Sequence, residues 1–304
     1  MRRRVLLLVN PLAASGRTLA TVERALASLK RHGFDCEQAH SEQGGHLTEL
    51  ARTLAPSCDI VLAAGGDGTV REVASGLLRA RAPETVLGVL PIGTGNDFAT
   101  QIGITDAETA LAALLEANVR TVDVIEARHS NRPGEPLDHA LLFAATGFAA
   151  ELLRRTSPRV KRLFGRRLSY SVGFFRALAG LRVPTMRLQA DGRAFAGPMF
   201  HVCAGNSEWA GGGAMRLSPG ARMDDGRLEI CLIGALGRFE ALRCFPMLLR
   251  GTFPGHPKVR YFGGQELSVA TEPSAPLALD GDVVGRTPAT FRVLPGALRV
   301  MMPA

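Results

Sequence analysis

Glycines and an aspartate stand together at the end of a short apolar run, in the segment Ala64–Thr69 (AGGDGT). Glycines let the backbone approach a phosphate closely, and the helical pattern that follows offers the free N–H groups of a helix N-terminus. Asp67 would repel phosphate unless a cation such as Mg²⁺ bridged the two. The segment therefore indicates a phosphate loop with a metal ion, and the alternative is a glycine turn in which Asp67 caps the helix.

A second polar loop, Leu90–Ala99 (LPIGTGNDFA), also follows an apolar run. Its glycines, Thr94 and the pair Asn96 and Asp97 form a polar crevice at the carboxyl end of a strand, where open α/β sheets bind ligands. The alternative is a loop with Asn96 or Asp97 as a helix cap. Phe98 stands in place of the last glycine of a GxGxxG motif, and no Walker A lysine occurs in the sequence. These departures argue against a dinucleotide dehydrogenase and against a P-loop enzyme.

Three further polar elements are weaker signals. Asn10 follows the first apolar run and, with Ser15 and nearby N–H groups, could hold phosphate oxygens. The Asp224–Gly226 segment is either a hairpin turn or a place where Asp225 and backbone carbonyls hold a hard cation. Two carboxylates surround a turn in Leu279–Asp282 (LDGD), which is either a surface turn or the source of a general base for a hydroxyl group.

Short apolar runs alternate with helical patterns through the first 127 residues. Buried strands separated by helices are typical of parallel βαβ units, so this part is predicted to be an α/β domain. The expected strands are Val5–Val9, Phe34–Ala39, Ile60–Ala64, Val86–Leu90 and Val122–Ala127, and the expected helices are Leu19–Arg31, Leu47–Leu54, Thr69–Leu78 and Asp106–Glu116.

The pattern changes after residue 128. Strand-like runs joined by Gly, Pro and Asp turns follow, interrupted by helical patterns near Leu168–Leu181 and Phe239–Leu249. Such a succession favours an antiparallel, β-rich domain. We therefore predict two domains, an α/β domain over residues 1–127 and a β-rich domain over residues 128–294.

Basic residues gather in one stretch of the chain. The formal net charge is +8, and the segment Leu152–Ala190 holds ten Lys or Arg residues and no acidic residue. This basic stretch, Arg154–Arg187, indicates a polyanionic partner, either nucleic acid or an anionic membrane. Because the chain has only two Tyr and one Trp, base stacking is not supported, and no nucleic-acid partner is expected.

The sequence shows neither a membrane span nor a disulfide framework. No apolar stretch approaches the roughly 20 residues that a membrane-spanning helix needs. The five cysteines include no CxxC pair, which favours reduced thiols in a cytosol over disulfides or a zinc cluster. A cytoplasmic protein is therefore expected.

In their order along the chain these elements resemble the diacylglycerol kinase catalytic superfamily, and most of all its soluble bacterial YegS-like lipid kinases, relatives of sphingosine and ceramide kinases. GGDGT alone also occurs in NAD kinases, whereas GGDGT, then PIGTGNDFA, then GGG with DDG and a late DGD is a specific combination. The resemblance spans the chain from Asn10 to Leu298. It implies an N-terminal α/β nucleotide-binding domain and a C-terminal β-sandwich, with about residues 295–304 returning to the first domain.

The resemblance also implies a role for each motif. Asp67 would position a catalytic Mg²⁺, and Asp282 would accept the proton of the hydroxyl group. A structural Mg²⁺ would be held by Asp225 and by the backbone carbonyls of Arg222 and Arg227. The candidate residues of the ATP site are Asn10, Ser41, Gly65, Gly66, Asp67, Gly68, Thr69, Glu72, Thr94, Asn96 and Asp97.

Three positions depart from the family pattern. Asp282 stands where the family usually has glutamate, so its shorter side chain must lie closer to its target or act through water. Arg71 stands where the family commonly has asparagine. The family often has a threonine near position 41, and Ser41 or His40 would have to replace it.

The implied activity is transfer of the γ-phosphoryl group of ATP to a hydroxyl group of a membrane lipid. Diacylglycerol, a sphingoid base, ceramide and phosphatidylglycerol all stay open as the acceptor. An NAD kinase and a catalytically inactive lipid-binding relative are the alternatives. The expected partners are the lipid substrate and an anionic membrane surface contacted through Arg154–Arg187, which would place the protein peripherally at the inner face of the membrane. A homodimer stays open.

Overall fold

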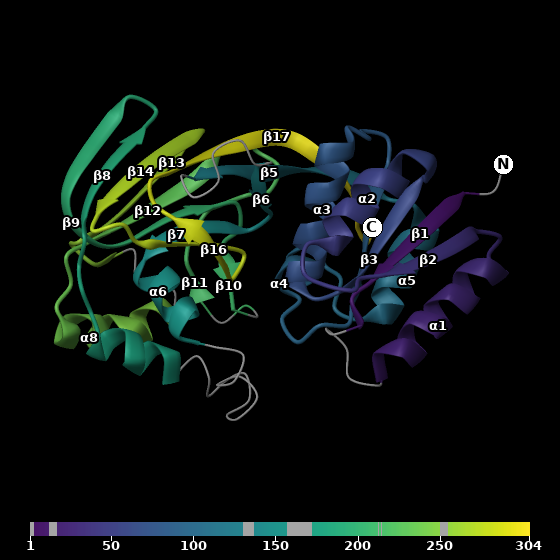
Figure 1. Cartoon of the computed structure of the whole chain (residues 1–304), viewed down its shortest axis with the longest axis horizontal. Coiled ribbons are helices and arrows are strands. Elements are labelled where there is room, and N and C mark those ends of the chain that lie inside the picture. Colours follow the sequence, from purple (N-terminus) through teal and green to yellow (C-terminus); the bar gives the residue numbers. More distant parts are fainter. Residues whose placement is uncertain are drawn as a thin grey trace. The chain divides into compact units, whose positions relative to one another are not determined.

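The chain divides into two units, which are described separately here (Figure 1). The first unit comprises Met1–Val124, Gly211–Gly213 and Pro295–Ala304, and the second comprises Ile125–Ala210 and Ala214–Leu294. The computed structural model describes residues 3–11, 17–129, 137–156, 172–211, 213, 215–249 and 255–304, without the side chains of residues 17, 18, 245, 248 and 249.

A parallel sheet with helices between its strands makes up the first unit. Its strands are β1 (Arg4–Val9), β2 (Asp35–His40), β3 (Ile60–Gly65) and β4 (Val86–Pro91). Its helices are α1 (Arg17–Arg31), α2 (His46–Leu54), α3 (Asp67–Ala80), α4 (Asp97–Gln101) and α5 (Ala107–Glu116). The strand order is β2–β1–β3–β4, and the end of β17 (Ala289–Met301) joins β4 in parallel, with Val300 opposite Leu87.

Close packing of α2 on α3 holds the helix that begins at the AGGDGT segment. Every residue of β3 and β4 is buried, as is typical of parallel strands covered on both faces. A Cβ atom added to Gly76 of α3 would lie 2.4 Å from the Cβ of Ala51 on α2, so only glycine fits there. The Thr48 hydroxyl on α2 donates a hydrogen bond to the backbone carbonyl of Glu72 at 3.0 Å. These contacts fix the position of α3.

The second unit is an antiparallel β-sandwich. Its strands are β5 (Val119–His129, from Ile125 onward), β6 (Asp138–Ala140), β7 (Phe143–Gly147), β8 (Thr185–Ala190), β9 (Arg193–Gly205), β12 (Leu228–Gly234), β13 (Val259–Gly264), β14 (Glu266–Glu272), β15 (Pro276–Leu279), β16 (Asp282–Arg286) and β17 up to Leu294. One sheet has the order β16–β15–β7–β9–β12–β13, and in the other β8 lies between β9 and β14. The long strand β9 belongs to both sheets, and apolar side chains such as Leu188, Val202 and Leu277 fill the core between them.

Helices cover part of the sandwich. They are α6 (Phe148–Arg155), a helical segment over residues 172–179 and α8 (Arg238–Leu249), and a small hairpin of β10 (Trp209–Ala210) and β11 (Met215–Arg216) lies in the same unit. The ring of Phe148 stacks on Phe200 of β9 at a centroid distance of 4.5 Å and meets Phe174 edge-on at 5.5 Å. These aromatic contacts attach α6 and the segment 172–179 to the sheet.

The predicted fold class is confirmed, because an α/β unit is followed by a β-sandwich-like unit. The helix predicted near Leu168–Leu181 is helical over residues 172–179, and its residues before 172 lie outside the described part of the chain. Among the described helices, none has the length and apolar composition needed to cross a bilayer.

Candidate active site

Two glycine loops pack against each other at the carboxyl ends of β3 and β4. The backbone N–H groups of Ile92 and Gly93 both donate to the carbonyl oxygen of Gly65, each at 3.1 Å. A Cβ atom added to Gly93 would lie 2.3 Å from the Cα of Gly66, so the two backbones touch without room for a side chain. The loops that the sequence singled out separately therefore form one structural element, which here is called the paired glycine loop (residues 65–69 and 92–96).

The paired glycine loop ends at the N-terminus of α3. The N-cap residue of this helix is Gly66, which has no side chain to cap the first N–H groups. Uncapped N–H groups at the start of a long helix, together with the helix dipole, favour an anion such as phosphate. Gly65 leaves room for Thr69, since a Cβ atom at Gly65 would lie 2.2 Å from the Thr69 hydroxyl oxygen. The amide of Asn10 donates to the same hydroxyl at 3.3 Å, which ties the end of β1 to the loop.

Asp67 connects the two halves of the paired glycine loop. Its Oδ1 accepts a hydrogen bond at 3.0 Å from the backbone N–H of Phe98, in the first turn of α4. Asp67 is itself the first residue of α3, and this hydrogen bond makes it a cap for the neighbouring helix α4. A contact to Mg²⁺ would have to coexist with this hydrogen bond.

Asn96 places an unsatisfied acceptor in the same loop. Its backbone is left-handed, with φ of 59° and ψ of 37°, a conformation that asparagine tolerates better than most residues. Its amide nitrogen donates to the carbonyl of Gly93 at 3.0 Å. Its side-chain oxygen is buried and has no hydrogen-bond partner among the described residues. A buried acceptor without a partner is costly, so this atom fits a donor or a cation from a bound ligand.

The remaining residues predicted for the ATP site lie on the same unit. Ser41 directly follows β2, and its N–H donates to the carbonyl of Val9 at 2.9 Å, beside the end of β1. Thr94 is exposed in the second half of the paired glycine loop, while Glu72 is half-buried on α3. Asp97 accepts a hydrogen bond from the N–H of Gly211 at 2.9 Å, which is consistent with a role in ordering the loop. The roles of these residues in binding ATP stay predictions.

The DGD turn of the second unit contains two different carboxylates. Asp282 opens β16, is exposed, and lies opposite Leu279 across a tight turn. Asp280, within the turn, has a left-handed backbone with φ of 46°. Its carboxylate accepts backbone hydrogen bonds at 2.7–2.9 Å from the three consecutive residues 141–143. Sequence reasoning assigned the chemical role to Asp282 and missed the anchoring role of Asp280, although a DG turn between two apolar strands is a signal for a hairpin.

The Asp224–Gly226 segment is a surface turn in the structure. Asp225 is exposed, and its Oδ1 accepts the backbone N–H of Arg227 at 3.0 Å. The guanidinium of Arg222 donates to Asp224 at 3.1 Å. These local contacts are the ones expected of an Asp-rich turn. The predicted metal site formed by Asp225 and the carbonyls of Arg222 and Arg227 stays a prediction.

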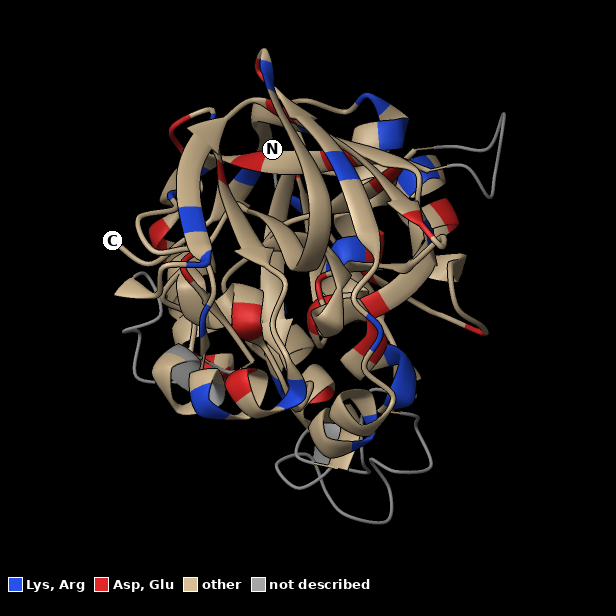
Figure 2. Ribbon diagram, turned by 90° about the vertical axis from the view of Figure 1, so that its left-hand side faces the viewer, with Lys and Arg blue, Asp and Glu red and all other residues tan. Residues whose placement is uncertain are grey.

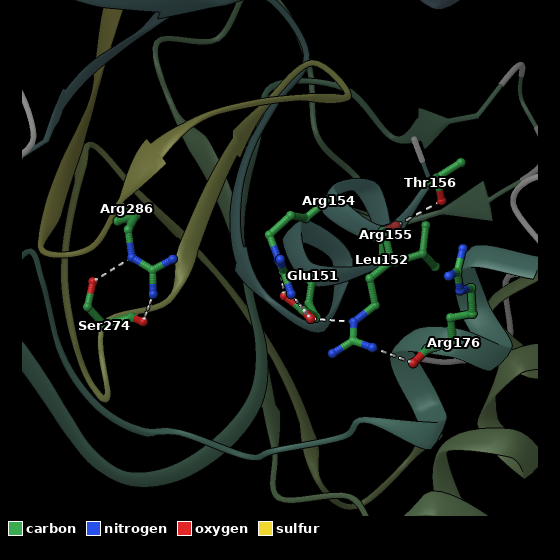
Figure 3. Close-up of polar contacts among 8 residues, drawn as sticks. All are labelled: Glu151, Leu152, Arg154, Arg155, Thr156, Arg176, Ser274 and Arg286. Carbon is green, nitrogen blue, oxygen red and sulfur yellow. Dashed lines mark hydrogen bonds and ion pairs between the residues drawn. The ribbon is translucent and has the colours of Figure 1, made fainter. Parts of the chain in front are cut away.

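The acidic residue Glu151 is paired with two arginines of the basic stretch (Figure 3). Glu151 forms ion pairs with Arg154, at 2.7 Å, and with Arg155. The Arg154 guanidinium in particular holds the pKa of the Glu151 carboxyl below its ordinary value. Arg155 also donates to the backbone carbonyl of Arg176 at 3.0 Å. Two of the ten basic residues are therefore paired with an acid that lies one position before the segment counted from Leu152.

Much of the basic stretch lies outside the described residues. Arg176, Arg182 and Arg187 are described, whereas Arg159, Lys161, Arg162, Arg166 and Arg167 are not. Over the described part of the chain, Lys and Arg positions are interspersed with Asp and Glu positions (Figure 2). The prediction of a basic surface thus depends on residues that the structure does not describe.

Comparison with known proteins identifies the family. Residues 4–127 match the family model of the diacylglycerol kinase catalytic domain. Residues 144–302 match the model of the YegS C-terminal NAD kinase beta sandwich-like domain. The chain belongs to the YegS-like branch of the diacylglycerol kinase family. The resemblance seen in its motifs is thereby confirmed, and the chain is a phosphotransferase with an alcohol group as acceptor.

Two bacterial relatives match this chain over nearly their whole length. A diacylglycerol kinase from Staphylococcus saprophyticus is 27% identical over 305 residues, which cover 100% of this chain and 96% of the relative. A diacylglycerol kinase from Staphylococcus aureus is 28% identical over 307 residues, covering 100% of this chain and 93% of the relative. The similarity therefore extends over both units.

Solved structures share the fold. A diacylglycerol kinase from Bacillus anthracis superposes with a TM-score of 0.73 at 23% identity, covering 99% of this chain and 97% of that one. A yeast NADH kinase in complex with NADH has a TM-score of 0.55 at 10% identity, covering 100% of this chain and 84% of that one. Since kinases with different acceptors have this fold, the fold alone does not select the acceptor.

The residues of the first unit support a phosphate-binding site more clearly than a metal site. Close backbone approach and the glycine N-cap of α3 suit a phosphate, and the unsatisfied oxygen of Asn96 suits a donor or a cation that is bound with it. Within the described residues, no three His, Cys, Asp or Glu side chains gather in a way that could hold a metal ion. Mg²⁺ is usually held by one or two carboxylates together with substrate phosphates and water, so Asp67 with a bound nucleotide is a compatible donor set.

Proposed function

We propose that this family member is an ATP-dependent lipid kinase that phosphorylates a hydroxyl group of a membrane lipid, with diacylglycerol as the first acceptor to test. The similarity of both units to proteins named diacylglycerol kinase carries this proposal. The geometry of the paired glycine loop supports it, because its glycines let a phosphate approach the backbone N–H groups at the start of α3.

The reaction is an in-line transfer of the γ-phosphoryl group. The N-terminus of α3 and the paired glycine loop bind and orient the nucleotide phosphates, and the Asn96 oxygen receives a donor or a cation of the bound ligand. When bound next to Asp67, Mg²⁺ supplies positive charge that offsets the charge on the transferred group. The oxygen of the lipid hydroxyl forms the new bond to the γ-phosphorus as the bond from this phosphorus to ADP breaks. Asp282 accepts the proton that the hydroxyl loses.

The test is a transfer assay with radiolabelled ATP against a panel of lipid acceptors. The panel contains diacylglycerol, a sphingoid base, ceramide and phosphatidylglycerol, and NAD is the control acceptor. We expect label in one lipid class and none in NADP. Labelled NADP without labelled lipid would show that the chain has NAD kinase activity instead. Absence of label in every acceptor, with lipid binding retained, would identify an inactive lipid-binding relative.

The proposal includes the membrane as a partner. Basic residues of the Arg154–Arg187 stretch would contact anionic lipid and hold a cytoplasmic protein peripherally at the inner face of the membrane. The pairs of Glu151 with Arg154 and Arg155 reduce the charge available for this contact. Replacing Arg159, Lys161, Arg162, Arg166 and Arg167 with Gln should remove the dependence of vesicle activity on anionic lipid and on salt, since such attraction is screened by ions. Unchanged vesicle binding in that variant would exclude this contact.

A further inference from the structure

One helix of the second unit is apolar on the side that faces away from its core. On its inner side α8 buries Ala241 and Cys244. On the opposite side Phe239 is 86% exposed and Leu242 is 43% exposed, although folding normally buries side chains of this kind. In Figure 1, α8 lies at the edge of the second unit.

Helical spacing connects these exposed side chains. Phe239, Leu242 and Pro246 occupy positions i, i+3 and i+7, which share one face of an α-helix, and all three are exposed. They are called the α8 stripe. The outer face of a helix on a globular protein is normally polar, so a helix with apolar residues on both faces indicates a partner for the outer face.

The charges around the α8 stripe are positive. Arg238 and Arg243 are exposed, and neither forms an ion pair within the described part of the chain. Glu240 is the one acidic residue of α8, and its carboxylate lies 2.7 Å from the ammonium of Lys258 and 3.8 Å from the imidazole of His256. The acid is therefore neutralised by residues outside the helix, and among the described residues the two arginines beside the stripe have no counter-charge.

A second copy of this chain is a poor partner for the stripe. The common two-fold contact brings the same patch of each copy together, so a patch must complement itself. Here a two-fold contact would bring Arg238 and Arg243 of both copies into one interface, with Glu240 already engaged. An anionic surface complements these charges instead.

We propose that the α8 stripe inserts into the interfacial region of an anionic lipid bilayer, with Arg238 and Arg243 in contact with lipid phosphates. Apolar side chains bordered by basic ones are typical of helices that lie in a membrane interface. The choice of a bilayer rests on the proposed function, in which the acceptor is a membrane lipid. The α8 stripe is separate in sequence from the Arg154–Arg187 stretch and adds an apolar contact that salt does not screen.

Vesicle sedimentation tests the insertion. The full-length protein is mixed with vesicles of phosphatidylglycerol and phosphatidylcholine, and the bound fraction is measured for the wild type and for the variant Phe239→Ser/Leu242→Ser. The variant should bind at least about tenfold more weakly, because its apolar contact is lost. The matched control is Leu115→Ser on α5, since Leu115 is also 43% exposed, and it should bind as the wild type does. Equal binding by all three proteins would overturn the proposal.

Vesicle binding also tests the contact that Arg238 and Arg243 are proposed to make with lipid phosphates. The variant Arg238→Gln/Arg243→Gln should lose part of its preference for phosphatidylglycerol and yet retain binding at high salt, where the apolar contact remains. A variant that binds phosphatidylglycerol as tightly as the wild type would remove the arginines from the contact. Sedimentation velocity without lipid tests whether a second copy of the chain covers the stripe instead. The proposal would be overturned if the wild type were a dimer, and if Phe239→Ser/Leu242→Ser were monomeric and bound vesicles as the wild type does.

Failure of the inference can be told apart from failure of the proposed function. Vesicle binding needs no ATP and no transfer, so it reports on α8 even if the wild type phosphorylates no lipid. In the transfer assay, Phe239→Ser/Leu242→Ser should lose activity on vesicles but keep it on a detergent-solubilised acceptor. An equal loss in detergent, in a variant with a wild-type unfolding temperature, would contradict a role limited to docking.

Discussion

Glycine serves different purposes in two motifs of the molecule, the paired glycine loop of the first unit and the DGD turn of the second. In the first unit, a Cβ atom on Gly65 would lie 2.2 Å from the hydroxyl oxygen of Thr69, and one on Gly93 would lie 2.3 Å from the Cα of Gly66. In the second unit, a Cβ atom on Gly281 would have no neighbour within 4 Å, but its φ of +90° favours glycine. The first glycines allow backbones to meet, and the last one allows a turn. An Asp-Gly motif alone does not distinguish these uses.

The carboxylates beside these glycines differ in the same way. Asp67 is half-buried and bridges two loops through its bond to the N–H of Phe98. Asp225 and Asp282 are exposed at turns. Close approach of backbones therefore distinguishes the paired glycine loop from these two exposed turns.

The largest effect is expected at Asp67. Asp67→Ala removes both a candidate Mg²⁺ ligand and the acceptor for Phe98, so phosphoryl transfer should fall to background, and excess Mg²⁺ should not restore it. Asp67→Asn is the matched control, because its side-chain oxygen can still accept the Phe98 N–H. It should also be inactive in the radiolabelled transfer assay if the negative charge holds a cation. Activity near that of the wild type in Asp67→Asn would reduce the role of Asp67 to joining the loops.

A smaller loss is expected at the DGD turn, where the two carboxylates can be compared. Asp282→Asn should lower turnover by ~10²–10⁴-fold with ATP affinity nearly unchanged, because only the proton acceptor is lost. Asp280→Asn should instead lower the free energy of unfolding by about 1–3 kcal/mol, since its carboxylate anchors three backbone N–H groups. Steady-state kinetics and urea unfolding separate the two results. A turnover loss in Asp280→Asn alone would move the proton acceptor to Asp280.

A third difference between the units appears at mildly acidic pH. His201 of β9 is buried, and burial lowers its pKa to about 4. Its Nδ1 lies 3.0 Å from the carbonyl oxygen of Thr146, to which the neutral ring donates. Because the folded pKa is below the unfolded one, this histidine costs no stability near pH 7, and stability falls as the pH drops from about 6.5 towards 4.

The expected loss is about 2 kcal/mol of unfolding free energy between pH 7 and pH 5. In the first unit, by contrast, Asp106 caps α5, and the N–H of Thr109 in particular lowers its pKa, so its contribution is lost only at more acidic pH. Urea unfolding of the wild type and of His201→Asn at both pH values isolates the contribution of His201 to the unfolding free energy. A pH dependence that is the same in both proteins would contradict the burial effect.

The local parts of this architecture were predictable from sequence. Apolar runs such as Ile60–Ala64 predicted strands, and the structure has β3 at Ile60–Gly65, because a buried parallel strand must be apolar on both faces. The β-rich second unit followed from short runs separated by turn residues. The specific order of the motifs also predicted the family, which the family models confirm.

Long-range contacts were not predictable from a single sequence. The bond from Asp67 to Phe98 spans 31 positions, and Asp280 reaches residues more than 130 positions away. The pairing of Glu151 with Arg154 and Arg155 is local, and helical i, i+3 and i, i+4 spacing could have revealed it. It was missed because the basic segment was counted from Leu152. The outward apolar face of α8 also needed the structure, since the pattern Phe239–Leu249 alone does not say which face is covered.

The proposed function requires that the paired glycine loop binds ATP. Calorimetric titration of ATP into two glycine variants tests this most directly. Gly93→Ala should bind ATP at least about 100-fold more weakly, because its methyl group would push Gly66 and the start of α3 out of position. Gly281→Ala, which strains only a turn, should lose about 1 kcal/mol of stability and bind ATP within a few-fold of the wild type. Circular dichroism at the assay temperature establishes that both variants are folded. Wild-type ATP affinity in a folded Gly93→Ala protein would contradict the account.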